Sequence, residues 1–147
     1  MGDGPHLAQL IQKRKDLKLE NYIEFLGWMP PADIPLMLQK CHVGVIPHVV
    51  SPFWNHTIPN KLFDFMLQGV PVLCTSAIPV KRILAEENCG LIISENPYEV
   101  ADLLMSLKKN LSYLKEMGEN GRQAVLKKYN WNKDGALLAS AIELQFT

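Results

Sequence analysis

Four short apolar runs, separated by segments of helical pattern, constrain the fold of this chain more than any other feature. The runs cover residues 22–27, 42–47, 70–76 and 91–94. Most are apolar throughout rather than at every second residue, which is typical of strands covered on both faces. Helical segments between such strands imply right-handed crossovers, so the sequence predicts an α/β fold, a Rossmann-like parallel sheet of about four strands flanked by helices.

The helices are predicted from apolar periodicity and from the residues that begin and end helices. They cover 6–15, 31–39, 59–68, 80–87, a segment beginning at residue 97, 112–128 and 132–144.

The helix predicted at 59–68 carries one line of polar side chains. Pro59 suits the first helical position and Gly69 the position just past the end. Lys61, Asp64 and Gln68 follow the spacing i, i+3, i+7 on a segment that is otherwise apolar. A helix N-terminus with a lysine can bind phosphate, although the same line could be the solvated edge of a core helix. We expect it to face a cleft at the carboxyl edge of the sheet, where ligands of such folds bind.

Composition and charge indicate an ordinary globular chain. The 147 residues suffice for one domain over 1–147, and 48% are apolar with a formal net charge of zero. The charge balance argues against nucleic acid as a partner, and no apolar run reaches the roughly 18 residues of a membrane span. The isolated Cys41, Cys74 and Cys89 are interpreted as reduced core thiols of a cytoplasmic protein, and no metal-binding cluster is present.

No phosphate-binding glycine loop and no serine nucleophile elbow occurs in the sequence. His48 and His56 lie in the loop after the second run, but lone histidines are more often structural than catalytic.

Residues 59–66, Pro-Asn-Lys-Leu-Phe-Asp-Phe-Met, and 69–72, Gly-Val-Pro-Val, resemble the P-N-K-L-F-E-Y-M-x-x-G-x-P-V block of family-4 (group 1) retaining glycosyltransferases. Weaker resemblances flank this block in the family's order, at 2–5, 23–27, 41–47, 88–91 and 117–131. The resemblance implies the C-terminal, donor-binding domain of a GT-B enzyme. Such a domain would be partial here, since the first two strands of the family's domain and an Arg/Lys pair that grips the diphosphate have no counterpart.

The resemblance also implies roles for single residues. Asp64 stands where the family has the second Glu of its E-x7-E motif, which binds the nucleotide ribose. His56 stands at the first Glu and departs from the motif, and Met29 matches a loop near the base. Lys61 would supply catalytic positive charge to the diphosphate. The positions whose backbone amides would face that diphosphate are Thr57, Ile58 and Asn60.

The function implied is retaining transfer of a sugar, of hexosyltransferase type, from a nucleotide-diphosphate sugar in polysaccharide or glycoconjugate biosynthesis. No metal or other cofactor is implied. A parent protein would add an N-terminal acceptor domain and could lie at the inner membrane face, and the isolated chain is expected to be inactive. Two alternatives stay open: a GT-B sugar-nucleotide epimerase, and a non-catalytic nucleotide-sugar-binding or interaction module.

The missing strands have a structural consequence. In the order 3-2-1-4-5-6 they would be the two central strands, which leaves the edge at 42–47 unpaired. We therefore expect either that the run at 22–27 closes against this edge, or that the chain self-associates along Val43, Val45 and Ile46.

Overall fold

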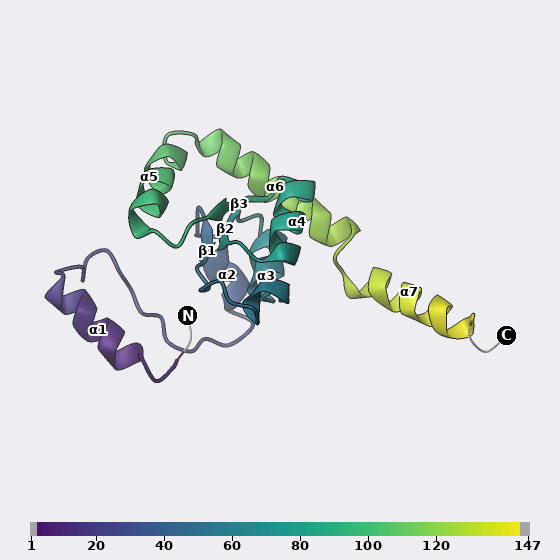
Figure 1. The fold of residues 1–147 in the computed structure, drawn as a ribbon, viewed down its shortest axis with the longest axis horizontal. Helices are drawn as coiled ribbons and strands as arrows, with labels where there is room; N and C mark the ends of the chain where they lie inside the picture. The colour runs from purple at the N-terminus through teal and green to yellow at the C-terminus, as the bar shows by residue number, and fades with distance from the viewer. Residues whose placement is uncertain (1–2, 145–147) are drawn as a thin grey trace. The chain divides into compact units, whose positions relative to one another are not determined.

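The computed structural model describes residues 3–144, and it divides into two compact units, Met1–Leu36 and Met37–Thr147. Figure 1 labels the helices and strands of both.

The first unit contains α1 (Leu7–Asp16), which confirms the helix predicted at 6–15. The strand predicted at 22–27 is wrong, because this segment is in no strand. Arg14 instead donates a hydrogen bond to the Ile23 carbonyl oxygen at 2.9 Å, and its guanidinium lies 5.4 Å from the centre of the Phe25 ring. A strand requires a neighbouring strand for its backbone groups, and no described strand pairs with this segment.

The second unit is built on a parallel sheet of three strands, β1 (Gly44–Ile46), β2 (Val72–Thr75) and β3 (Gly90–Ile93). Their order is β1-β2-β3, with Gly44 opposite Val72 and Val72 opposite Gly90. The parallel α/β architecture is therefore confirmed, with three strands rather than four. All three lie within predicted runs or within one residue of them.

Helices connect and follow the strands. The bounds of the other elements are α2 (Ile34–Leu38), the 3₁₀ turn η1 (Trp54–His56), α3 (Lys61–Leu67), α4 (Ile78–Glu87), α5 (Pro97–Leu107), α6 (Leu111–Lys127) and α7 (Trp131–Glu143). The central helix α3 begins two residues after Pro59 and ends before Gly69, whose φ of +71° turns the chain out of the helix.

The core lies on both faces of the sheet, and every residue of β2 is buried. Val72 and Cys74 pack in a cluster with side chains of α3, α4 and the end of α6. Leu73 packs in the opposite cluster with residues of α5 and the start of α6. Cys74 and Cys89 are core thiols as predicted, but Cys41 is exposed because it lies in the turn between α2 and β1.

The outer edge of β1 pairs with no strand in residues 3–144. The Gly44 amide donates to the Pro71 carbonyl oxygen at 2.9 Å, so the alternate residue Val45 points its backbone groups away from β2. Since 22–27 forms no strand, the expectation that it closes this edge is not met. Self-association along β1 stays a prediction.

Candidate functional site

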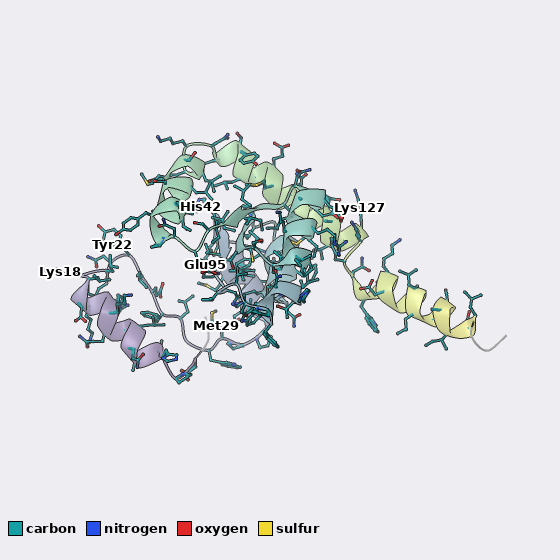
Figure 2. All side chains as sticks on the ribbon, in the orientation of Figure 1. Lys18, Tyr22, Met29, His42, Glu95 and Lys127 are labelled. Carbon is teal, nitrogen blue, oxygen red and sulfur yellow. The ribbon has the colours of Figure 1, made fainter. Side chains whose placement is uncertain are left out.

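The long loop after β1 is fastened at the carboxyl edge of the sheet. The Thr75 hydroxyl, at the end of β2, donates to the His48 carbonyl oxygen at 2.5 Å. The Val50 amide donates to the Glu95 carboxylate at 2.7 Å, and Glu95, labelled in Figure 2, follows β3. The loop is thus attached to the ends of two neighbouring strands before the chain enters α3.

Lys61 is the first residue of α3, and its side chain is exposed. Burial lowers the pKa of His48, and the positive charge of Lys61 lowers it further. Burial raises the pKa of Cys74 to about 11, and here Lys61 acts in the opposite direction. Because His48 follows β1 and Cys74 lies near the end of β2, these effects place Lys61 within electrostatic reach of the carboxyl edge.

Several polar groups around the start of α3 have no partner in residues 3–144. The Lys61 ammonium and the exposed Asp64 carboxylate make no ion pair and no side-chain hydrogen bond to the described part of the chain. The Ile58 and Asn60 amides donate to no described acceptor. These four groups could therefore meet a ligand without breaking an existing contact.

Other predicted groups are already engaged. The Thr57 amide and hydroxyl both donate to the Trp54 carbonyl oxygen, at 3.1 and 3.0 Å. Gln68 accepts a hydrogen bond from the Gln39 side chain at 2.9 Å, so it is tied to the segment after α2. Of the predicted polar line, Lys61 and Asp64 alone remain available within the described residues.

His56 and Met29 lie in different units. His56 is exposed at the last residue of η1. Met29 is half-buried within the unit Met1–Leu36, and its role near a base stays a prediction.

A hollow of about 440 Å³ opens where the three strands end. Its walls are mostly apolar, with Val45, Val100 and Leu104 beside the polar Thr75 and Glu95. Sequence reasoning did not single out these last two residues. Their positions, at the end of β2 and directly after β3, were the only sequence signal for them.

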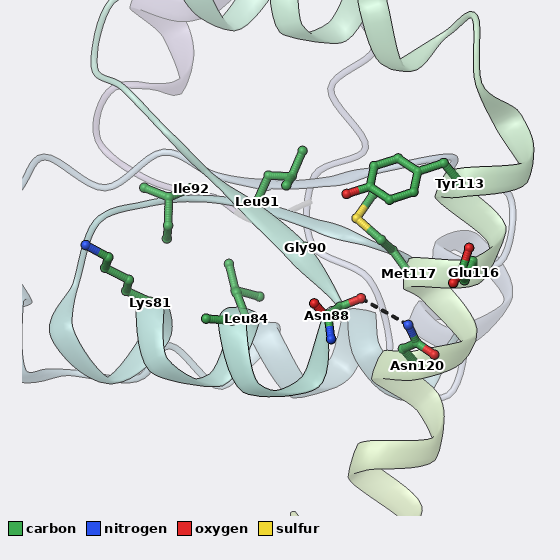
Figure 3. A pocket seen from close by; sticks show the side chains of 11 residues that line it. Lys81, Leu84, Asn88, Gly90, Leu91, Ile92, Tyr113, Glu116, Met117 and Asn120 are labelled. Carbon is green, nitrogen blue, oxygen red and sulfur yellow. Dashed lines mark hydrogen bonds between the residues drawn. The ribbon is translucent and has the colours of Figure 1, made fainter.

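A groove of similar volume, about 440 Å³, lies beside β3 between α4 and α6 (Figure 3). The Asn120 side chain donates to the Asn88 carbonyl oxygen at 3.3 Å there, and Lys81 and Glu116 lie toward opposite ends. None of the predicted site residues lines this groove.

The described residues contain no group of three or more His, Cys, Asp and Glu side chains suited to a metal ion. Within the same residues, no helix is both long and apolar enough to cross a membrane.

His48 is expected to make stability depend on pH near neutrality. Its pKa in the folded chain lies below 6.5, so the unfolded chain binds the proton first as the pH falls. The free energy of unfolding should decrease from pH 7.5 to 5.5, and urea titrations should show a smaller decrease for His48→Gln. Glu87 does not contribute to this decrease. The hydrogen bond from Lys128 lowers the pKa of Glu87, so its titration changes the free energy of unfolding only below about pH 4.5. Equal decreases in both proteins would contradict the assignment to His48.

The family follows from the sequence profile described as "Glycosyl transferases group 1", which matches residues 1–124. The chain belongs to this family. The resemblance noted for the 59–72 block is thereby confirmed.

Curated relatives of this glycosyltransferase chain are longer proteins. Chitobiosyldiphosphodolichol beta-mannosyltransferase of Kluyveromyces lactis is 26% identical over 137 residues, which are 92% of this chain and 30% of that protein. The putative colanic acid biosynthesis glycosyltransferase WcaL of Escherichia coli is 26% identical over 97 residues, 65% of this chain and 24% of that protein. The chain thus spans less than a third of the length of either relative.

Solved structures confirm the GT-B-type fold of the domain. Sucrose-phosphate synthase from Thermosynechococcus elongatus superposes with a TM-score of 0.83 at 16% identity, over 99% of this chain and 37% of that one. HepE of Anabaena, solved in complex with UDP, superposes with a TM-score of 0.81 at 18% identity, over 93% and 36%.

Proposed function

We propose that this chain binds the nucleotide-diphosphate sugar of a retaining glycosyltransferase in polysaccharide or glycoconjugate biosynthesis. The observation that carries the proposal is a set of groups at the start of α3 that have no partner within residues 3–144, namely the Lys61 ammonium and the Ile58 and Asn60 amides. They lie where the polypeptide returns from the carboxyl edge of the sheet, which is the usual ligand position in open α/β folds. The UDP present in the HepE structure supports a nucleotide diphosphate as the ligand class.

The chemistry of sugar transfer explains why a positive side chain and backbone amides suit this site. When the bond between the sugar and the diphosphate breaks, the negative charge on the departing diphosphate grows. A positive side chain and oriented amides stabilise that charge more than they stabilise the intact donor, which is how such groups lower a barrier. Lys61, Ile58 and Asn60 would do this without a metal ion or other cofactor. The Asp64 carboxylate, one turn along α3, would accept hydrogen bonds from the ribose hydroxyls.

Transfer requires more than this chain. We propose that a longer, cytoplasmic protein supplies a second domain that binds the acceptor, since the chain covers only about a third of its relatives. The WcaL relative is named for colanic acid biosynthesis, which supports a polysaccharide or glycoconjugate product. The 147-residue chain alone should bind donor but not turn it over.

Titration calorimetry of this chain with UDP, GDP and their glucose and mannose conjugates tests the proposal. At least one nucleotide should bind, and Asp64→Ala should weaken it by about 1–3 kcal/mol, or about 5- to 150-fold, the scale of a hydrogen bond to a charged group. Asp102→Ala is the matched control, because Asp102 is another exposed helical carboxylate, on α5.

Two outcomes would count against the proposal. Failure of every nucleotide to bind would favour the non-catalytic interaction module. Parental affinity in Asp64→Ala would remove Asp64 from the site.

A further inference from the structure

The segment 57–60 carries the Ile58 and Asn60 amides, which have no acceptor within residues 3–144, and it is held from both sides. On the α3 side, the Pro59 and Asn60 carbonyl oxygens accept hydrogen bonds from the Leu62 and Phe63 amides at 2.9 and 3.0 Å. The segment lies between η1 and α3 and belongs to neither, and Pro59 has no N–H to donate. Its hydrogen bonds toward the preceding residues, within the described chain, are the two from Thr57 to the Trp54 carbonyl oxygen. The position of Trp54 therefore decides where this segment begins.

Trp54 is itself held by a neighbouring ring. The His48 and Trp54 rings are stacked, with centroids 4.1 Å apart and planes within 8° of parallel. The Trp54 amide also donates to the Ser51 hydroxyl at 3.3 Å. Stacked aromatic rings fix orientation as well as distance, so the indole cannot turn without losing this contact.

His48 connects the stack to the sheet. Its carbonyl oxygen accepts the hydrogen bond from Thr75, which is only 5% exposed at the end of β2. The Nε2 atom of His48 is buried and has no hydrogen-bond partner in residues 3–144, so packing rather than hydrogen bonding holds the ring. A space of only about 10 Å³ lies among His48, Trp54, Thr57, Pro59 and Thr75, so these side chains are closely packed against one another.

We propose that His48 and Trp54 are a positioning pair. Their contacts connect the segment 57–60 to the rigid end of β2 and so orient its amides toward the donor diphosphate. Neither ring needs to touch the donor. Amides bind a phosphate well only when they already point at it, because reorganisation upon binding would consume the interaction energy. This inference rests on the proposed donor binding and adds the residues that make the site rigid.

The test compares variants that remove or keep the stack. One nucleoside diphosphate, the one that the parent binds, is used for all variants. Trp54→Leu and His48→Ala should each lower the affinity for it at least tenfold. Trp54→Phe and His48→Phe keep an aromatic ring and should return affinity to within about threefold of the parent. Trp131→Leu is the matched control, because Trp131 is 74% exposed on α7.

A second ligand separates positioning from general loosening of the fold. The corresponding nucleoside, uridine or guanosine, lacks the phosphates and should bind the variants and the parent equally, as followed by NMR titration. An equal loss for nucleoside and diphosphate would overturn the proposal, as would parental affinity for the diphosphate in His48→Ala. If Trp54→Leu fails to fold, the affinities of His48→Ala for the diphosphate and the nucleoside test the proposal alone. If the parent binds no nucleotide, both the proposed function and this inference are refuted. If the parent binds a nucleotide and the variants bind it equally well, only this inference is refuted.

Discussion

Gly118→Ala is expected to lower the free energy of unfolding of this chain by about 2–3 kcal/mol, in the upper range for an overpacked core position. Gly118 lies in α6 where that helix crosses the end of α3, and a methyl group added there would overlap the carbonyl oxygen of Gly69. The neighbour is backbone and cannot swing aside like a side chain. Gly69 is itself fixed, because it has a positive φ and its amide donates to the Met66 carbonyl oxygen at 3.0 Å.

Gly135→Ala provides the matched control in α7. A methyl group at Gly135 would come no closer than 3.6 Å to the Trp131 ring, which is an ordinary contact. Since alanine favours a helix over glycine by about 0.5–1 kcal/mol, this variant should be neutral or more stable than the parent. Urea unfolding followed by circular dichroism gives both values. If Gly118→Ala were as stable as Gly135→Ala, the close crossing of α6 and α3 would be wrong.

Lys61→Ala should lower kcat/KM of the proposed longer transferase by about 100-fold or more, the usual loss when one group that stabilises developing negative charge is removed. The loss should exceed that of Asp64→Ala, because the ribose carries the same charge before and during transfer while the diphosphate does not. The structure leaves the Lys61 ammonium without a carboxylate partner in residues 3–144, so no ion pair would be broken in the variant.

Initial-rate measurements with the nucleotide sugar that binds best would check this result. Lys115→Ala, on the exposed surface of α6, is the control and should keep the parental rate. A fall in kcat/KM for Lys61→Ala that comes only from a higher KM would mean that Lys61 binds the donor and its departing diphosphate equally. Parental kinetics would exclude Lys61 from the reaction.

Much of the sheet could be predicted because each strand is marked by an apolar run in its own stretch of sequence. The runs that became β1, β2 and β3 are apolar almost throughout, and β2, which is buried at every position, needs such a run wherever it pairs. The end of α3 was likewise predictable, since Gly69 takes the left-handed conformation that glycine adopts most easily. The segment 22–27 has an equally good strand pattern, yet it forms none, because a strand also depends on a partner that its own residues do not encode.

The candidate site divides in the same way. The sequence by itself determined the family, the helix α3 and the placing of Lys61 and Asp64 on one line along it, because helical spacing and a contiguous motif are properties of neighbouring residues. Only the tertiary structure decided which groups near that helix stay free. Gln68 is taken by Gln39, 29 residues away, and His48 is anchored by Thr75, 27 residues away. Hydrogen bonds between distant segments form only after the chain has packed, and no local pattern records them.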